Sequence, residues 1–248
     1  MTHRASPTSA IDDVLLDGLI FCGLDYDLFD GIRKGRDGIE RLRLRKSKIE
    51  KRLIEELLPL ARYVQARYRE GRRIKVRWLS GSQSYDAILW SLGGLVDQGM
   101  APRRAVVEIT GSMHENEYLA RQLLQTQGGS WGVKGITRDP KTRLVTSKPH
   151  VHKNDEIMVD LMGQILSRLE SKAEKKYPAN TVLIMQCFAN TLTLESEWKD
   201  SVKRVEEARP LIPFRELFLV EAGNSYTATI WGQRPKARSR RSRKLIKP

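Results

Sequence analysis

The stretch at residues 181–188 constrains the fold of this 248-residue chain more than any other segment. Its sequence, TVLIMQCF, is the most strand-like run in the chain. A continuous apolar run of this length is typical of a strand that is buried on both faces of a sheet. We therefore expect residues 181–188 to form a central strand.

The rest of the chain predicts helices and strands that would surround this strand. Apolar residues three or four positions apart predict a helix over residues 39–70, which Pro59 should kink or divide. The other predicted elements are strands at 74–79, 85–90 and 104–110, a helix at 115–127, a hairpin within 131–151, a helix from Asn154 to before Pro178, a helix at 194–208, and strands at 214–221 and 225–231. This order predicts an α/β fold with a central mixed β-sheet flanked by helices.

The chain divides into three expected regions. Residues 1–37 mix apolar and acidic residues and are interrupted by glycines, so we expect an N-terminal extension of short helices. Residues 38–233 contain the remaining predicted helices and strands and are long enough for one α/β domain. Residues 234–248 have no apolar periodicity, and we expect a basic tail that is disordered until it meets a polyanion.

The net charge of +14 is concentrated in two short segments. Residues 234–248 carry eight Lys and Arg and no acid, whereas residues 33–52 carry ten Lys and Arg against three acids, so the rest of the chain is close to neutral. Such segments are typical of salt-sensitive, sequence-independent contacts to phosphate backbones. The candidate nucleic-acid-binding residues are Arg43, Arg45, Lys46 and Lys48 in the first segment and Arg238, Arg240, Arg241, Arg243 and Lys244 in the tail.

The cysteines and the apolar runs bear on the compartment. Cys22 and Cys187 are far apart in the chain and form neither a disulfide framework nor a structural zinc motif, which favours the reducing cytoplasm. The early apolar stretch contains Asp17 and lacks the pattern of a signal peptide. Because no apolar window is long enough to span a bilayer, we expect no membrane partner.

Two acids in strand-like runs are candidate metal ligands. Asp86 opens one predicted strand, and Glu108 lies inside the next one. A buried carboxylate is costly unless it is paired or binds a cation. If the two strands are neighbours, the carboxylates converge and could hold Mg²⁺ or Mn²⁺, which can activate water against a phosphodiester. Alternatively, Asp86 is an ordinary turn-capping residue after a Ser/Gly loop.

Glu56 is a third candidate acid. On the helix predicted for residues 39–70 it flanks the apolar stripe, so it can lie beside the packed face. The alternative is a helix-surface acid that pairs with Arg52.

The order of these residues resembles the core of the PD-(D/E)XK, or restriction-endonuclease-like, nuclease superfamily. The resemblance covers roughly residues 45–190: a helix with Glu56, a strand, Tyr85-Asp86, a strand with Glu108-Ile109-Thr110, and a helix. It implies that Asp86 and Glu108 bind the metal and that Glu56 assists. Tyr85 stands where the superfamily has proline, and Thr110 stands where it has the catalytic lysine.

Thr110 puts catalysis in question, because a hydroxyl cannot supply the positive charge that stabilises a phosphoryl transition state. The residues considered as substitutes are Arg121 and Gln122 on the predicted helix at 115–127 and Lys134 after it. Thr110 itself would remain in the site as a hydrogen-bonding group.

Two functions are therefore expected from the sequence. The first is metal-dependent hydrolysis of nucleic acid, with DNA favoured over RNA, in which the basic tail and residues 33–52 hold the phosphate backbone. The second is a non-catalytic nucleic-acid-binding protein of the same fold, a component of a larger bacterial, phage or plasmid nucleoprotein assembly. The sequence leaves open whether the chain acts as a homodimer or within a larger protein assembly, and whether the tail binds acidic lipid or a protein instead.

Overall fold

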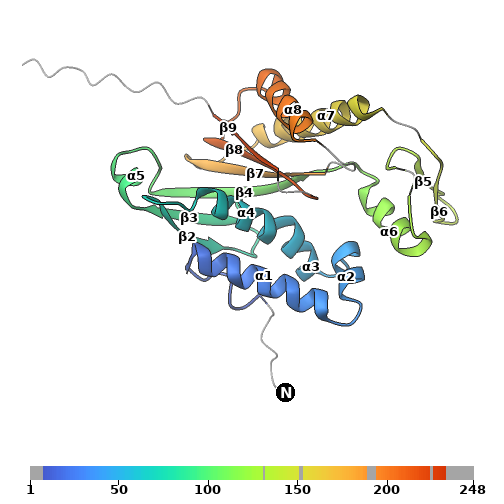
Figure 1. The fold of residues 1–248 in the computed structure, drawn as a ribbon, viewed down its shortest axis with the longest axis horizontal. Helices are drawn as coiled ribbons and strands as arrows, with labels where there is room; N and C mark the ends of the chain where they lie inside the picture. The colour runs from blue at the N-terminus through green and yellow to red at the C-terminus, as the bar shows by residue number, and fades with distance from the viewer. Residues whose placement is uncertain (1–7, 131, 151–152, 189–193, 224–225, 233–248) are drawn as a thin grey trace, which may run out of the picture.

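A computed structural model describes residues 8–130, 132–150, 153–188, 194–223 and 226–232 of the chain. These residues form an α/β fold around a seven-stranded mixed sheet, as the sequence predicts (Figure 1). In spatial order the strands are β1 (Leu16–Asp17), β2 (Arg73–Trp78), β3 (Ala87–Leu92), β4 (Arg104–Ser112), β7 (Thr181–Cys187), β8 (Glu216–Glu221) and β9 (Thr227–Trp231). From β1 to β4, each strand is antiparallel to the next one. Strands β4, β7 and β8 run parallel to one another, and β9 is antiparallel to β8.

Strand β7 lies in the middle of the sheet, between β4 and β8. All of its residues are buried, which confirms the central strand predicted from residues 181–188. Its side chains alternate between two cores, because successive residues of a strand point to opposite faces. Val182 and Ile184 face the first core, and Leu183 and Met185 face the second.

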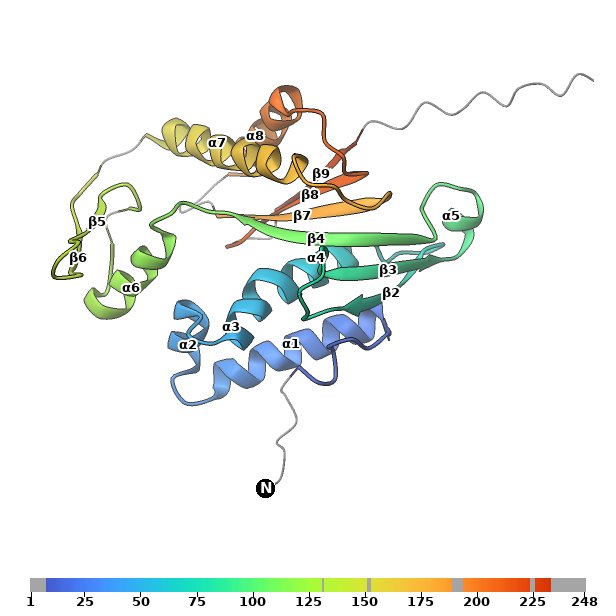
Figure 2. The ribbon, with the colours of Figure 1, turned by 180° about the vertical axis from the view of Figure 1, so that it is seen from behind.

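Helices α1 (Gly18–Lys34) and α4 (Leu58–Arg67) pack on the first face of the sheet (Figures 1 and 2). The expectation of short helical pieces before residue 38 was wrong, because α1 is one continuous helix of 17 residues capped by Asp17. Phe21 lies fully inside the first core. The N-terminal region is therefore an integral part of the α/β fold, not an extension of it.

The helix predicted over residues 39–70 is divided into four pieces. They are α2 (Gly38–Leu44), α3 (Lys48–Arg52), the π-helical turn η1 (Leu53–Leu57) and α4. Arg45 ends α2 with φ of 51° and ψ of 49°. Pro59 is the second residue of α4 and cannot donate a backbone hydrogen bond to the preceding turn, which accounts for the irregular winding before it. The winding thus changes next to Pro59 without a gap between η1 and α4, and the helix is divided instead at Arg45.

Helices α7 (Asn154–Ala173) and α8 (Glu195–Ala208) cover the second face of the sheet over β7, β8 and β9 (Figure 2). Leu161, Ile165 and Leu169 of α7 are buried in this core, as the spacing of apolar residues predicts. The N-cap of α7 is Lys153, one residue before the predicted start. None of the described helices is long and apolar enough to cross a membrane.

A small lobe lies beyond the end of the sheet (Figure 1). It contains α6 (Glu117–Gln127) and a two-stranded hairpin of β5 (Ile136–Arg138) and β6 (Val145–Ser147), which confirms the predicted hairpin. Leu123, Ile136 and Val145 form its own small core. At the opposite end of β4, the short helix α5 (Gly94–Asp97) belongs to the connection from β3.

Candidate active site

Asp86 and Glu108 lie opposite each other on neighbouring antiparallel strands. Ala87 of β3 pairs with Val107 of β4, and the Asp86 amide donates a 2.8 Å hydrogen bond to the Val107 carbonyl. The Asp86 carboxylate is held in place because its Oδ2 accepts a 2.6 Å hydrogen bond from the Ile109 amide. The structure thus brings together the two acids that the sequence selected.

The electrostatic state of Asp86 reflects a crowded, partly buried acidic site. Burial raises the pKa of its carboxyl to about 7, against the lowering effect of the Ile109 amide. The negative charges of Glu108 and Glu56 raise the pKa further, and the charge of Lys172 lowers it. An additional cation near this carboxyl would therefore stabilise its ionised form.

Lys172 brings a positive charge next to Glu108. It lies near the end of α7, and its ammonium forms an ion pair with the Glu108 carboxylate. Both side chains are only 12% exposed. Tyr177, after the helix, lies nearby: burial and then the charge of Glu108 raise the pKa of its hydroxyl to about 12. The site therefore contains two carboxylates and one lysine, all largely removed from water.

Sequence reasoning missed Lys172, although a signal was present. The buried stripe of α7 contains Ile165 and Leu169, and Lys172 continues it three residues after Leu169. A lysine in the line of a buried stripe needs an acidic partner, because an unpaired buried charge is costly. The partner, Glu108, lies 64 residues away in the chain.

The other two predicted site residues differ in their placement. Thr110 is half-buried and, two residues after Glu108, has its side chain on the same face of β4. Glu56 lies in η1 and accepts a 3.2 Å hydrogen bond from the Trp78 indole. Burial raises the pKa of the Glu56 carboxyl, while Arg52 lowers it. Because its charge acts on Asp86, Glu56 belongs to the surroundings of the pair.

The residues considered as substitutes for a lysine at position 110 lie elsewhere. Gln122 is exposed on α6, which packs against α2 and the β5–β6 hairpin beyond the sheet (Figure 1), so it does not join the carboxylates. Arg121 pairs with Glu117. Lys134 pairs with Asp160 of α7.

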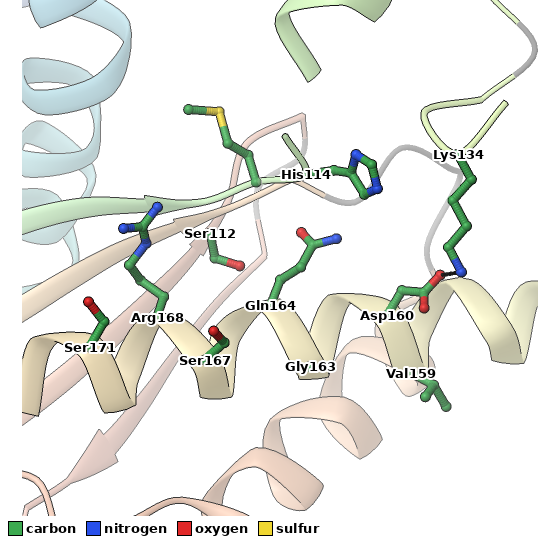
Figure 3. A pocket seen from close by; sticks show the side chains of 11 residues that line it. Ser112, His114, Lys134, Val159, Asp160, Gly163, Gln164, Ser167, Arg168 and Ser171 are labelled. Carbon is green, nitrogen blue, oxygen red and sulfur yellow. Dashed lines mark ion pairs between the residues drawn. The ribbon is translucent and has the colours of Figure 1, made fainter. Parts of the chain in front are cut away.

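A groove lies between the end of β4 and α7 and extends to Lys134, and Asp86, Glu108 and Lys172 are not among its lining residues. Its volume is about 760 Å³. Figure 3 shows its side chains, which come from the end of β4, from Lys134 and from α7: Ser112, Met113, His114, Lys134, Val159, Asp160, Gly163, Gln164, Ser167, Arg168 and Ser171. The buried Ser112 Oγ and Gln164 Oε1 have no hydrogen-bond partner among the described residues. The groove thus offers polar groups that a ligand could engage.

The basic segment at residues 33–52 is largely neutralised within the fold. Arg45 is buried with a 4% exposed side chain and pairs with Glu55, so its assignment to a nucleic-acid surface was wrong. Lys46 pairs with Glu40, and Arg43 donates a 2.9 Å hydrogen bond to Gln125. Lys48 is exposed and, unlike the other three predicted contacts in this segment, has no ion-pair or hydrogen-bond partner among the described residues.

The predicted contacts in the tail lie outside the described residues. They are Arg238, Arg240, Arg241, Arg243 and Lys244.

Two further findings bear on the class of protein. Among the described residues, no group of three or more His, Cys, Asp or Glu side chains is arranged to hold a metal ion, so any metal here would rest on the Asp86–Glu108 pair and non-acidic ligands. Comparisons with protein-family models, curated proteins and solved structures found no match. What the structure defines is an α/β protein in which Asp86, Glu108 and Lys172 lie close enough to act on one another electrostatically.

Proposed function

We propose that this protein is a metal-dependent nuclease whose active site contains Asp86, Glu108 and Lys172. The carrying observation is that Asp86, directly before β3, lies beside β4 with its carboxylate held by the Ile109 amide next to Glu108, while Lys172 of α7 pairs with Glu108. The order of α4, β2, β3, β4, α7 and β7 agrees with the core that the sequence resembles. Cys22 and Cys187 are buried free thiols, which supports a reducing compartment such as the cytoplasm.

Asp86 and Glu108 fit a hard divalent cation. Carboxylate oxygens are the donors that Mg²⁺ and Mn²⁺ prefer. Burial raises the pKa of Asp86, as do the negative charges of Glu108 and Glu56 to a smaller extent, and a bound cation would favour its ionised form. When bound, such a cation lowers the pKa of a coordinated water and polarises a phosphodiester. The Ile109 amide keeps Asp86 Oδ2 oriented, so the remaining oxygen of this carboxylate is the one available as a ligand.

Lys172 carries out the charge stabilisation in this proposal. Its ammonium neutralises Glu108 in the free protein and would turn to the phosphate oxygens when substrate arrives. A preorganised cation in a site largely shielded from water contributes strongly to stabilising a phosphoryl transition state. Thr110, on the same strand face as Glu108, adds a hydroxyl that can orient water. Glu56 acts through the electrostatics of Asp86 and contacts no substrate.

The test is cleavage of supercoiled plasmid, linear duplex, single-stranded DNA and RNA with Mg²⁺ or Mn²⁺ and with chelator. Asp86→Asn and Glu108→Gln should abolish metal-dependent cleavage. Lys172→Met should lower the rate by about 100-fold or more, because it removes one preorganised charge. Glu195→Gln, which breaks a Lys–Glu ion pair on the surface of α8, is the matched control and should cleave normally.

Two results would contradict the proposal. One is cleavage that persists in the Asp86→Asn/Glu108→Gln double variant. The other is the absence of cleavage of all four substrates. In the second case, retained salt-sensitive binding would favour the non-catalytic alternative, a nucleic-acid-binding component of a larger assembly. The ion pair that engages Glu108 is the observation that favours this alternative.

In this proposal the tail binds the phosphate backbone of the nucleic acid without sequence preference. Deleting residues 234–248 should make binding less dependent on salt, because fewer counterions are released when fewer phosphates are contacted. An unchanged salt dependence would remove the tail from the binding surface.

A further inference from the structure

Helices cover only part of the second face of the sheet. Helices α7 and α8 pack over β7, β8 and β9, whereas no described helix packs over the same face of β2 and β3, where Ile88 of β3 is nevertheless buried (Figures 1 and 2). On β2 the side chains of Ile74, Val76 and Trp78 enter the first core, so the alternate residues point to the open side. Arg73 and Lys75, which alternate with them, are exposed.

A cross-strand row of a lysine, a tryptophan and an arginine occupies this open side. Lys75 pairs in register with Trp90 of β3, and Trp90 pairs with Arg104 of β4. Residues paired across antiparallel strands have their side chains on the same face. Lys75 and Arg104 are exposed, and Trp90 is half-buried. We call Arg73, Lys75, Trp90 and Arg104 the open basic face.

The charge of this face is not neutralised within the described part of the chain. Arg73, Lys75 and Arg104 form no ion pair with another described residue. Arg77, two residues after Lys75, differs because it pairs with Asp13. Asp17 lies opposite Lys75 in the sheet, but its carboxylate accepts hydrogen bonds from the Leu19 amide and the Tyr68 hydroxyl. The open basic face therefore offers net positive charge.

The open basic face and the candidate active site share one face of β4, where the buried Val106 lies between Arg104 and Glu108. Arg104 and Glu108 belong to the same strand, and at a rise of about 3.3 Å per residue their Cα atoms are roughly 13 Å apart. Their side chains point to the same side of the sheet, because the residues are an even number of positions apart. A chain that crosses this face would reach the carboxylates within a few nucleotides.

We infer that the open basic face binds a single-stranded segment of nucleic acid and leads it to the Asp86–Glu108 pair. Lys75 and Arg104 contact phosphates, and the indole of Trp90 between them stacks on an unpaired base. Cations that flank an aromatic ring form the combination that single strands require, since every base presents a stacking surface. A duplex keeps its bases paired and would engage the cations but not the ring. The inference rests on the proposed function in taking nucleic acid as the partner.

Binding in the presence of chelator tests this inference apart from catalysis. Labelled single-stranded DNA, single-stranded RNA and duplex DNA are titrated with the full chain, and binding is followed by fluorescence anisotropy at several salt concentrations. We expect single strands to bind more tightly than duplex. Tighter binding of DNA or of RNA would identify the natural strand, and both results support the inference.

Variants of the open basic face give the quantitative readout. Lys75→Glu/Arg104→Glu should weaken single-strand binding by about tenfold or more and lower the magnitude of the salt slope by about 1.4, the value for two lost phosphate contacts. Trp90→Ala should weaken binding by about tenfold with the slope unchanged, because stacking releases no counterions. Trp90→Phe, which retains a ring, should restore most of the affinity and separates stacking from a folding defect.

The matched control is Arg62→Glu/Lys203→Glu, which reverses the same charge on exposed residues of α4 and α8. It should bind as the unaltered protein does. Equal weakening in this control and in Lys75→Glu/Arg104→Glu would overturn the inference, and so would duplex binding as tight as single-strand binding with Trp90→Ala unaffected.

The inference and the proposed function fail separately. If the unaltered protein cleaves nucleic acid while the variants of the open basic face bind normally, the inference is wrong and the proposed function stands. If binding depends on this face but no substrate is cleaved, the inference stands and the nuclease assignment is wrong.

Discussion

Replacing Asp86 with asparagine should change how the stability of this protein depends on pH. The asparagine amide keeps an oxygen that can accept the Ile109 hydrogen bond, so the exchange removes the charge and preserves the shape. Burial, with the charges of Glu108 and Glu56, holds the pKa of Asp86 at about 7 in the folded protein, compared with 3.8 for an ordinary aspartate. The folded state therefore retains a proton that the unfolded chain releases.

The sign of the effect follows from this difference in proton binding. Between the ordinary pKa and about 7 the folded state binds more protons, so the free energy of unfolding of the unaltered protein falls as pH rises. From pH 5 to pH 8 the loss attributable to Asp86 is about 2.5 kcal/mol. The Asp86→Asn variant lacks this loss and should gain stability relative to the unaltered protein by that amount over the same range.

Urea unfolding of both proteins at the two pH values, followed by circular dichroism, measures the difference. Glu195→Gln serves as a control, because Glu195 is fully exposed and should not reproduce a gain at high pH. Adding Mg²⁺ at pH 8 should stabilise the unaltered protein clearly more than Asp86→Asn, since the amide oxygen of asparagine lacks the negative charge that attracts the cation. A stability difference between the two proteins that is the same at pH 5 and pH 8 would refute the account of Asp86.

Two further predictions concern the core. Arg67 donates a 3.0 Å hydrogen bond from Nε to Glu216, and Glu216 also accepts a 3.1 Å hydrogen bond from the Tyr63 hydroxyl. Because Arg67→Ala leaves the buried carboxylate of Glu216 without its cation, it should lower the free energy of unfolding by about 3 to 5 kcal/mol in urea. A loss under about 1 kcal/mol would show that the ion pair is not needed for stability. Burial raises the pKa of the Cys22 thiol to about 12, so a thiol-specific reagent should modify Cys22 slowly at pH 8 in the native protein and rapidly in urea, and fast native labelling would disprove its burial.

Local pattern was sufficient for the elements and for the two acids. The strands at Asp86 and Glu108 are neighbours in sequence and in space, and short connections between strands favour antiparallel pairing. Their carboxylates could therefore be placed together from the order of residues alone. The hairpin of β5 and β6 and the central strand β7 were also predictable, because each has a local apolar pattern and local turn residues.

Long-range packing decided what local pattern could not. The interruption at Arg45 and the continuity of α1 depend on how these helices meet the sheet, not on the glycines and charges that dominate their sequences. Arg45 resembled an exposed cation in a basic run, yet its guanidinium pairs with Glu55 and lies over the rings of Tyr118 and Phe188. A count of charges along the chain contains no information about which of them become buried.

The sequence by itself determined the α/β class and the central strand and selected Asp86 and Glu108 as candidates, because each depends on residues close together in the chain or on the period of apolar side chains. Only the tertiary structure decided that Lys172 pairs with Glu108 and that Lys75, Trp90 and Arg104 lie in one row on the same face of the sheet. The position of Lys172 and the absence of a helix over β2 and β3 both depend on where α7 and α8 pack on the sheet. That placement is set by the packing of whole faces against each other, which no single segment encodes.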